Sequence, residues 1–344
     1  MKIEENKPLD DLNTFGLVVG ARYFAEVASV EEFRELMKSE VYQMNKKLIL
    51  GGGSNILFTD CVNGLVVKNS IKGISVISET ETEVIVSANA GEVWHEFVLW
   101  CIERNYAGIE NLSLIPGLVG AAPMQNIGAY GVEIKDVFQE LEAINMETGE
   151  TIKFNLNDCG FGYRESVFKN KCKNKFFIAT VTFKLTKLSS PKAIYKFKTD
   201  YGDIKDTLSE MRAYELSIKA VSDAVIKIRN SKLPNPKELG NAGSFFKNPS
   251  ISKMQFDELV LKYPVMPSYP QKDGSIKIPA GWLIEQCGWK GKVVGNTGSH
   301  KSQALVLVNY GNASGKEIWN LALEIQKSVK EKFGIEIMPE VNVV

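Results

Sequence analysis

Histidine is scarce in this chain: among 344 residues there are only His95 and His300. Neither shares a motif with an acidic partner, and no His, Asp and Glu residues show metal-ligand spacing. We expect His95 to be a surface or boundary residue within a helix, between the apolar pairs, and His300 to lie in a loop where it hydrogen-bonds. The sequence therefore disfavours both a histidine-activated nucleophile and a metal site.

Cysteines and long apolar runs are also limited. The five cysteines are odd in number and never spaced as C-x-x-C, so we expect buried reduced thiols rather than disulfides or a zinc site. No run of about 18 apolar residues suggests a membrane span. Residues 1–7 have no apolar core and do not read as a signal peptide. These absences predict a cytoplasmic protein that does not enter a membrane.

The chain has no excess of either charge, because 41 Lys and Arg balance 41 Asp and Glu. A zero balance provides no long-range field to attract nucleic acid or an anionic membrane. A small anionic ligand needs only a few cations, so such a ligand stays compatible with the composition. Nothing in the sequence implies an obligate protein partner.

Helical and strand-like segments alternate along the chain, which at this length favours two or three domains. A capping box formed by Ser29 and Glu32 opens the first expected helix. The expected helices are 31–38, 93–104, 207–229, 253–263, 280–287 and 315–332. The expected strands are 47–50, 64–68, 74–77, 84–88, 140–146, 151–154, 177–185, 304–308 and 335–341. The polar segment 188–206 contains Pro191 and is expected to be a linker or an inserted loop.

Two glycine-rich tracts stand out. The first, Gly51-Gly52-Gly53-Ser54-Asn55, follows an expected strand, and backbone N–H groups of such a turn can converge on an anion. It is not a Walker loop, because no Gly-Lys-Ser/Thr follows. It is not a dinucleotide fingerprint either, since Ile56 onward continues as a strand. An ordinary turn remains the alternative.

The second tract, 116–131, is sixteen residues long, rich in Gly, Ala, Pro and Asn, and carries no charge. We expect a loop that wraps closely around an extended ligand. The alternative is a long surface loop, which would tolerate more charge. Two such tracts together suggest a nucleotide cofactor.

Ser244 lies in the string Asn241 to Pro249, Asn-Ala-Gly-Ser-Phe-Phe-Lys-Asn-Pro. It is not in a Gly-x-Ser-x-Gly elbow, because Ala242 and Phe246 occupy the glycine positions. A nucleophilic serine needs a base, and none is visible. Ser244 is therefore either structural or a residue that gives its proton.

Several further polar residues admit two interpretations. Arg164, among glycines and aromatics, either binds an anion or forms a structural ion pair. Glu340 follows Pro339 in a strand-like run and is either functional or simply solvated. Tyr201 is a loop aromatic. Arg229 and Lys232 either clamp a phosphate or are charges near a helix C-terminus.

In this order, these segments resemble the UDP-N-acetylenolpyruvoylglucosamine reductase family. The resemblance spans nearly the whole chain, and the Asn241–Pro249 string is its most specific part. The matching segments are 51–57, 115–131, 162–166, 241–249, 280–287 and 339–341. The tyrosine loop 199–203 resembles that of the long-loop, type I subclass.

The resemblance implies an α+β chain: a vanillyl-alcohol-oxidase-type (PCMH-like) FAD-binding fold followed by a C-terminal α/β substrate domain. It implies an FAD-binding domain over 1–205, with two subdomains split near residue 70, and a substrate-binding domain over 206–344. The implied catalytic residues are Arg164, Ser244 and Glu340. The implied substrate-binding residues are Tyr201, Arg229, Lys232, Asn248 and Gln303. The implied FAD-binding residues are Gly51, Gly52, Gly53, Ser54, Asn55, Pro116, Gly117, Gly120, Ala121, Gln125, Asn126, Gly128, Ala129, Tyr130 and Gly131.

The activity implied is reduction of UDP-N-acetylenolpyruvoylglucosamine to UDP-N-acetylmuramate, with non-covalent FAD as cofactor and NADPH as co-substrate. That step belongs to peptidoglycan synthesis, and so to cell wall biogenesis, cell shape, cell cycle and cell division. Asn342 departs from the family, which often has arginine there. Two alternatives remain: an alcohol-oxidising flavoenzyme, disfavoured because neither glycine tract holds a His or Cys for a covalent flavin link, and a catalytically silent nucleotide-binding module.

Overall fold

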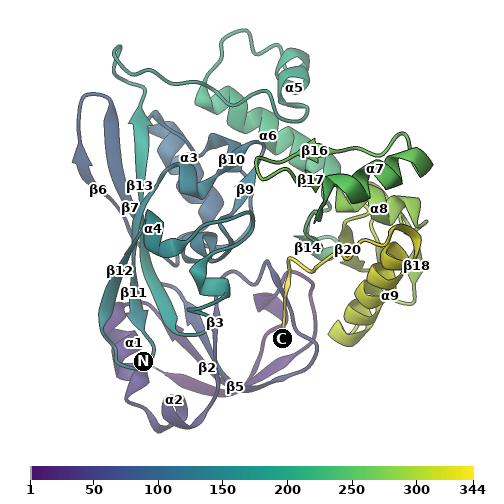
Figure 1. Cartoon of the computed structure of the whole chain (residues 1–344). Helices are drawn as coiled ribbons and strands as arrows, with labels where there is room; N and C mark the ends of the chain where they lie inside the picture. Colours follow the sequence, from purple (N-terminus) through teal and green to yellow (C-terminus); the bar gives the residue numbers. More distant parts are fainter. Residues whose placement is uncertain (1) are drawn as a thin grey trace. The chain divides into compact units, whose positions relative to one another are not determined.

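The structure, a computed structural model, describes residues 2–344 and divides into two compact units (Figure 1). Unit 1 comprises residues 2–7, 21–52 and 63–231. Unit 2 comprises residues 8–20, 53–62 and 232–344. The chain thus passes between the units inside the first glycine tract, after Gly52, and again after Ser231.

The first sheet of unit 1 has the strand order β1-β2-β5-β3, with β3 parallel to β5. Ser29 caps the first helix by accepting a hydrogen bond from the Glu32 N–H at 3.1 Å, but the Glu32 carboxylate accepts from the Ala28 N–H, so only half of the expected capping box forms. Phe33 stacks on Phe177 with ring centroids 4.0 Å apart. The elements are β1 (Ile3–Pro8), β2 (Gly20–Val27), α1 (Val30–Met37), α2 (Glu40–Met44), β3 (Lys47–Leu50) and β5 (Val62–Asn69).

The second sheet of unit 1 is antiparallel, with order β12-β11-β13-β7-β6 and β8 paired to β13. The long strands run side by side in Figure 1, and β7 buries every second residue. Helix α3 contributes Trp94 and Phe97 to the core beside Phe183. The elements are β6 (Ile74–Glu79), β7 (Glu83–Asn89), α3 (Trp94–Glu103), β8 (Tyr106–Ala107), β11 (Phe138–Asn145), β12 (Thr151–Asn155), α4 (Leu156–Cys159) and β13 (Phe176–Lys187).

The second glycine tract is more regular than expected. Its middle forms a 3-10 helix, η3 (Val119–Gln125), and its end a hairpin of β9 (Gly128–Ala129) and β10 (Val132–Glu133). The expected helix 207–229 is two helices, because a turn at 211–217 interrupts it. The remaining elements of unit 1 are η2 (Glu110–Leu112), η4 (Ile134–Asp136), η5 (Val167–Lys169), α5 (Ile204–Glu210) and α6 (Ile218–Lys232), whose final residue falls in unit 2.

Unit 2 is built on a sheet of order β14-β20-β19-β18, against which the long helix α9 packs beside α8. A capping box at Ser314 opens α9 and left-handed Gly334 ends it. The larger elements are β14 (Gly240–Ser244), α7 (Lys253–Lys262), α8 (Ala280–Gln286), β19 (Thr297–Ser299), β20 (Val306–Asn309) and α9 (Gly315–Phe333). The shorter ones are η1 (Asp10–Leu12), β4 (Ile56–Leu57), β15 (Ser250–Ile251), β16 (Tyr269–Pro270), β17 (Ile276–Lys277), β18 (Val293–Val294) and β21 (Asn342–Val343).

One expected strand is wrong. Residues 335–341 alternate between buried and exposed side chains, which is why the sequence resembles a strand, yet only Pro339 forms a β-bridge, to Phe246. A strand also needs a continuous backbone partner. Here part of that pairing is taken over by Gln326, whose side chain on α9 donates to the Ile337 carbonyl oxygen at 2.6 Å. The run is extended but is not part of a sheet.

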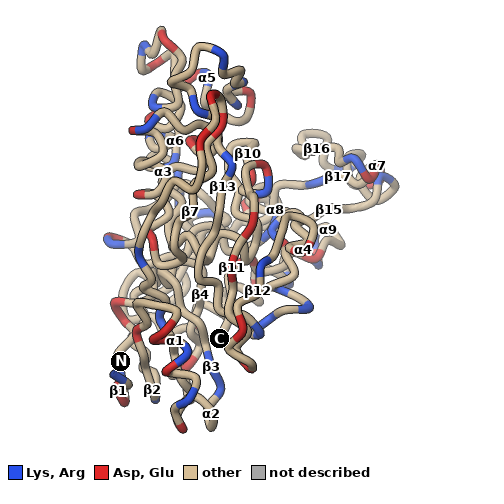
Figure 2. The backbone as a smooth tube through the Cα atoms, turned by 90° about the vertical axis from the view of Figure 1, so that its left-hand side faces the viewer, with Lys and Arg blue, Asp and Glu red and all other residues tan. Residues whose placement is uncertain are grey.

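The remaining observations concern charge, membrane spans, metal clusters and cysteines. Figure 2 shows acidic and basic residues interspersed along the tube. Within residues 2–344, no helix is both long and apolar enough to cross a bilayer, and no cluster of His, Cys, Asp and Glu could hold a metal ion. Cys101 and Cys159 are buried free thiols, and burial raises the pKa of Cys159 to about 12. Cys61 is exposed, so the expectation of buried thiols is wrong there.

Candidate functional site

The expected site residues fall into two groups, one in each unit. Unit 1 holds Gly51, Gly52, Pro116, Gly117, Gly120, Ala121, Gln125, Asn126, Gly128, Ala129, Tyr130, Gly131, Arg164, Tyr201 and Arg229. Unit 2 holds Gly53, Ser54, Asn55, Lys232, Ser244, Asn248, Gln303 and Glu340. Each group is described by itself.

In unit 1 the two glycine tracts lie against each other. A Cβ atom on Gly52 would come within 3.0 Å of the Gly117 Cα, so this approach leaves no room for a side chain. The Trp94 N–H donates to the Gly117 carbonyl at 3.0 Å and fixes the second tract at the start of α3. At Gly120 a Cβ would lie 2.4 Å from that of Ala90. The bare backbone at this junction fits a cradle for an extended cofactor such as FAD.

The end of the second tract is held by Asn126, which adopts the left-handed conformation (φ 45°). Its Nδ2 donates to the Glu133 carboxylate and to the Gly162 carbonyl, both at 3.0 Å. Its Oδ1 accepts from the Lys135 N–H at 3.1 Å. One buried side chain thus connects the tract to the hairpin and to the segment that carries Arg164.

Arg164 is brought to the second tract directly. Its Nη2 donates to the Gly128 carbonyl at 2.6 Å, and its guanidinium lies 5.5 Å from the Tyr163 ring centre. Its backbone has a φ of 55°, a conformation that a non-glycine residue adopts at a cost. The residues around Arg164 therefore hold it in an unfavourable backbone conformation, which is common among functional residues.

A second guanidinium belongs to the same group. The Arg229 side chain is largely buried on α6, and burial together with the positive charge of Arg164 lowers the pKa of Arg229, although Tyr130 opposes this. Among the described residues nothing accepts a hydrogen bond from its Nε. Two cations in a partly buried setting repel one another unless an anion joins them. An anionic ligand would give the buried Arg229 Nε an acceptor.

Tyr201 lies on the segment that joins β13 to α5, and this segment reaches the second tract. A Cβ on Gly131 would come within 3.4 Å of the Tyr201 Cβ, and one on Gly202 within 3.8 Å of the Tyr130 ring. Tyr201 itself is largely exposed. The structure thus brings the substrate tyrosine expected from the sequence next to the expected cofactor tract.

In unit 2 Ser244 ends strand β14 and pairs with Val306 of β20. Gly243 before it has a φ of 69°, and the ladder slips between Asn241 and Ser244. The Asn241 Oδ1 accepts from the Gly243 N–H at 2.9 Å and holds this bulge. Bulges redirect side chains, and here the bulge directly precedes the candidate proton donor.

Glu340 is paired through its backbone with Phe245, the residue that follows Ser244. Its N–H donates to the Phe245 carbonyl at 2.7 Å, and the Lys247 N–H donates to the Met338 carbonyl at 2.9 Å. Phe245 and Phe246 are fully buried and anchor this pairing in the core. The run 338–340 is therefore docked along the residues that follow Ser244.

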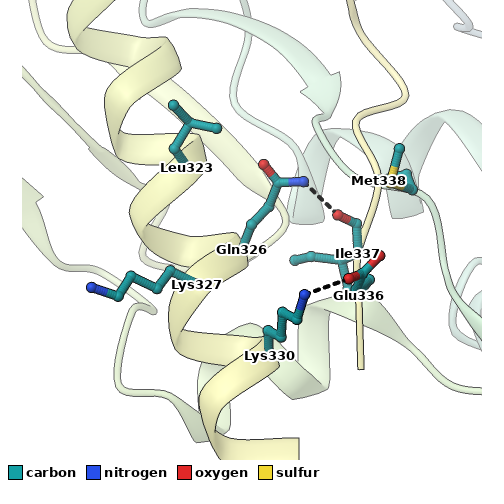
Figure 3. A pocket seen from close by; sticks show the side chains of 7 residues that line it. All are labelled: Leu323, Gln326, Lys327, Lys330, Glu336, Ile337 and Met338. Atoms are coloured by element: carbon teal, nitrogen blue, oxygen red, sulfur yellow. Dashed lines mark hydrogen bonds and ion pairs between the residues drawn. The ribbon is translucent and has the colours of Figure 1, made fainter. Parts of the chain in front are cut away.

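The chain around Glu340 is also held from its other sides. Figure 3 shows Gln326 and Lys330 of α9 reaching the Ile337 carbonyl and the Glu336 carboxylate, both at 2.6 Å. The pocket drawn there contains none of the expected catalytic residues. Its lining residues instead hold the chain that leads to Glu340. Beyond Glu340, strand β21 pairs in parallel with β4, which follows the first glycine tract.

No histidine serves Ser244 within unit 2. The His300 N–H donates to the Val306 carbonyl at 2.9 Å, and β20 pairs with β14 on one side and with β19, which ends at Ser299, on the other. The His300 Nδ1 is buried and has no hydrogen-bonding partner among the described residues. Strand β20 therefore lies between the backbones of His300 and Ser244. The reading of Ser244 as a proton donor does not require a histidine.

The two weaker candidates, Asn248 and Gln303, make local contacts within unit 2. The Asn248 Oδ1 accepts from the Ala280 N–H at 2.9 Å and so caps α8. Gln303 lies in the turn before β20, with its Oε1 at 3.0 Å from the position that a Gly281 Cβ would take. Lys232 is the last residue of α6. The sequence alone shows none of these local settings.

Sequence reasoning missed two buried polar residues, Glu110 and Asn111, each 1% exposed. They precede the second tract and contact Tyr195 and Lys198, which lie just before the tyrosine loop. Buried carboxylates are rare unless they are hydrogen-bonded. Their position between Ile109 and Leu112, directly before a Pro-Gly tract, was the available signal.

Comparison with known proteins identifies the class first. Residues 21–155 match the family described as FAD binding domain, so unit 1 carries the flavin-binding fold expected from the sequence. Residues 235–344 match the family described as UDP-N-acetylenolpyruvoylglucosamine reductase, C-terminal domain. The chain is therefore an FAD-dependent oxidoreductase, which confirms that part of the expectation.

Full-length relatives define the family more narrowly. A UDP-N-acetylenolpyruvoylglucosamine reductase of Flavobacterium johnsoniae is 52% identical over 100% of both chains. One of Amoebophilus asiaticus is 49% identical, again over 100% of both chains. The chain belongs to the UDP-N-acetylenolpyruvoylglucosamine reductase family, as its motifs indicate.

A solved structure shows the same fold. The crystal structure of UDP-N-acetylenolpyruvylglucosamine reductase from Thermus caldophilus aligns with a TM-score of 0.68, covering 100% of this chain and 99% of that one. The identity is 22%, so this likeness concerns the fold alone. The α+β architecture with an FAD-binding fold and a C-terminal α/β domain is confirmed.

Proposed function

We propose that this protein reduces UDP-N-acetylenolpyruvoylglucosamine to UDP-N-acetylmuramate, with bound FAD as cofactor and NADPH as the electron source. Supporting this are the family membership and one structural observation: the backbone of Glu340 pairs with Phe245, the residue after Ser244, while β20 lies between the backbones of His300 and Ser244. A serine without a base suits a step in which the hydroxyl gives its proton. The product is a nucleotide precursor of peptidoglycan, so the protein acts in the cytoplasm and serves cell wall biogenesis, cell shape and division.

The roles of the two regions follow the resemblance. Residues 1–205 form the FAD-binding domain, divided near residue 70, and 206–344 the substrate-binding domain. The family matches over 21–155 and 235–344 support this assignment. Three segments are exceptions: residues 8–20 and 53–62 pack within unit 2, and residues 206–231 pack within unit 1. The first glycine tract holds FAD through Gly51 to Asn55. The second does so through Pro116, Gly117, Gly120, Ala121, Gln125, Asn126, Gly128, Ala129, Tyr130 and Gly131.

When bound, FAD would supply hydride transfer from NADPH to the methylene carbon of the enolpyruvyl ether. Arg164, as a cation, stabilises the negative charge that then develops on the substrate carboxylate. Glu340, protonated, donates a hydrogen bond to the same group. Such electrostatic help is worth roughly 3–4 kcal/mol per group.

Ser244 completes the reduction by donating its Oγ proton to the carbon next to the carboxylate. A hydroxyl is a weak acid, so this transfer requires a strongly basic acceptor, and the carbon that has gained the electron pair is one. The substrate is bound by Tyr201, Arg229, Lys232, Asn248 and Gln303, with Lys232 on the diphosphate. Each of these roles is part of the proposal.

The direct test is a turnover assay with purified holoenzyme. NADPH and UDP-N-acetylenolpyruvoylglucosamine should disappear in equal amounts, with a product that has gained two hydrogen atoms by mass spectrometry. An alcohol-oxidising flavoenzyme would instead reduce O2 with a small alcohol and leave the enolpyruvyl sugar unchanged. A nucleotide-binding module would be purified without a flavin spectrum.

A further inference from the structure

Four consecutive buried residues, Glu110 to Ser113, stand immediately before the second glycine tract. Each side chain is at most 1% exposed, although three of the four are polar. Buried polar groups persist only where hydrogen bonds compensate for the lost water. The partners of these residues therefore show what the segment is for.

The side chain of Glu110 anchors the loop 188–203, whose last residues are the tyrosine loop 199–203. The Tyr195 hydroxyl donates to its Oε1 at 2.5 Å, and the Gly108 N–H donates to its Oε2 at 2.8 Å. Burial, and then the neighbouring Glu110, raise the pKa of Tyr195 well above its ordinary value, so Tyr195 keeps its proton and donates it. Both carboxylate oxygens are satisfied without an ion pair to any residue of the described chain.

Asn111 anchors the same loop a few residues further on. Its Nδ2 donates to the Lys198 carbonyl at 2.7 Å and to the Tyr130 carbonyl at 3.0 Å. One amide thus joins the loop to the second glycine tract. Tyr201 follows Lys198 by three residues and meets Gly131, the residue after Tyr130.

Ser113 extends the connection to α6, the second helix after the loop. Its Oγ is 2.7 Å from the Ser222 Oγ of α6, and it donates to the Glu110 carbonyl at 2.7 Å. The loop is therefore fixed through Tyr195 and Lys198, and helix α6 through Ser222. All three contacts converge on one short buried turn.

We infer that Glu110 and Asn111 are positioning residues that hold the segment Tyr195–Tyr201 against the second glycine tract, so that Tyr201 is presented to the UDP-sugar. The inference deepens the proposed function and rests on it for the identity of the ligand. The two residues do not touch the reacting atoms. They act on binding, by lowering the conformational freedom that the loop would otherwise lose when the substrate binds.

Tyr195→Phe tests this in the holoenzyme, because it removes one hydroxyl and keeps the ring that packs on Phe197 with centroids 5.2 Å apart. We expect KM for UDP-N-acetylenolpyruvoylglucosamine to rise about tenfold, with kcat, FAD content and KM for NADPH unchanged. Trypsin should also cut the loop after Lys196 and Lys198 faster, by a similar factor. Tyr214→Phe is the matched control, since Tyr214 is 92% exposed.

A double-mutant cycle with Glu110→Gln separates the anchor from general loosening. If the Glu110–Tyr195 contact carries the effect, Tyr195→Phe changes the trypsin rate much less in the Glu110→Gln background than in the wild type. Should Glu110→Gln fail to fold, the single Tyr195→Phe comparison still decides. Unchanged KM and trypsin cleavage in Tyr195→Phe, matching Tyr214→Phe, would overturn the inference.

The two proposals fail in different ways. If the wild-type holoenzyme does not reduce the UDP-sugar, the proposed function is wrong, whatever the loop does. If the wild type turns over and Tyr195→Phe lowers kcat or FAD content with KM unaltered, the anchoring role toward substrate is wrong. Trypsin cleavage reports on the loop in either case.

Discussion

The side chain of Asn55 holds the backbone of Glu340: its Nδ2 donates to the Glu340 carbonyl at 3.3 Å. In return the Asn55 carbonyl accepts from the Asn342 backbone N–H at 3.1 Å and from the Asn342 Nδ2 at 3.0 Å. The last residue of the first glycine tract and the candidate acid are thus connected within unit 2. Asn342, where the family often has arginine, takes part in this support.

This relationship predicts that Asn342→Ala weakens the second half-reaction. A lost hydrogen bond is worth about 1 kcal/mol, so reoxidation of the reduced flavin by the UDP-sugar should slow about fivefold. Flavin reduction by NADPH should be unchanged, because the substitution leaves the tracts of unit 1 intact. Anaerobic stopped-flow measures the two rates separately. Asn296→Ala, at an exposed asparagine of the same unit, is the control, and equal rates in both variants would argue against the support role.

Ser244→Ala should separate the two half-reactions much further. General acid catalysis contributes roughly 10²–10⁴ in rate, so substrate reduction should fall by that factor while NADPH still reduces the flavin at the wild-type rate. Ser250→Ala, at an exposed serine six residues further along the chain, provides the comparison. If both half-reactions of Ser244→Ala slow together, the serine positions the flavin or the fold instead.

The junction of the glycine tracts predicts different outcomes for two similar substitutions. Gly120→Ala places a Cβ 2.4 Å from that of Ala90, so the unfolding temperature should fall even without FAD. Gly51→Ala makes only contacts of 3.7–3.9 Å to the protein, so the FAD-free protein should be about as stable as the wild type. If Gly51 approaches FAD closely, its affinity for FAD should still drop about tenfold or more. Thermal unfolding with and without FAD distinguishes these cases.

Stability should depend on pH through His95. Its Nδ1 accepts from the Leu114 N–H at 3.0 Å, and burial lowers the pKa of His95 below its ordinary 6.5, with Arg229 adding to this and Glu96 opposing it. The unfolded state therefore binds a proton at a higher pH than the folded state. The free energy of unfolding should be fully retained above about pH 6.5 and decline below it.

Thermal unfolding at pH 8 and pH 5 tests this assignment. The wild type should lose more stability on acidification than His95→Gln, by about 2–4 °C. His300 is a natural comparison, because burial also lowers its pKa. An equal acid-induced loss in the wild type and His95→Gln would show that other groups cause it.

Local patterns predicted most of the regular elements. A helix is expected over 315–332, and α9 spans Gly315–Phe333, between the capping box at Ser314 and Gly334. Strand β3 has the predicted bounds, because four apolar residues lead directly into a glycine turn. Such signals lie within a few residues of the element that they specify.

Long-range contacts could not be predicted in the same way. Nothing in the sequence shows that residues 8–20 pack in unit 2, where the Phe15 carbonyl accepts from the Asn309 side chain at 2.9 Å. The run 335–341 alternates like a strand, yet its partner is partly a glutamine side chain. The left-handed backbone of Arg164 is likewise imposed by its surroundings. The roles of the site residues stay predictions until the variants are measured.

The most direct test of the account follows the flavin colour of the wild-type holoenzyme by anaerobic stopped-flow. NADPH should bleach the flavin in the absence of the sugar, and UDP-N-acetylenolpyruvoylglucosamine added afterwards should restore the oxidised spectrum as UDP-N-acetylmuramate forms. A flavin that NADPH reduces, but that stays reduced in the presence of the enolpyruvyl sugar, would contradict the proposed function.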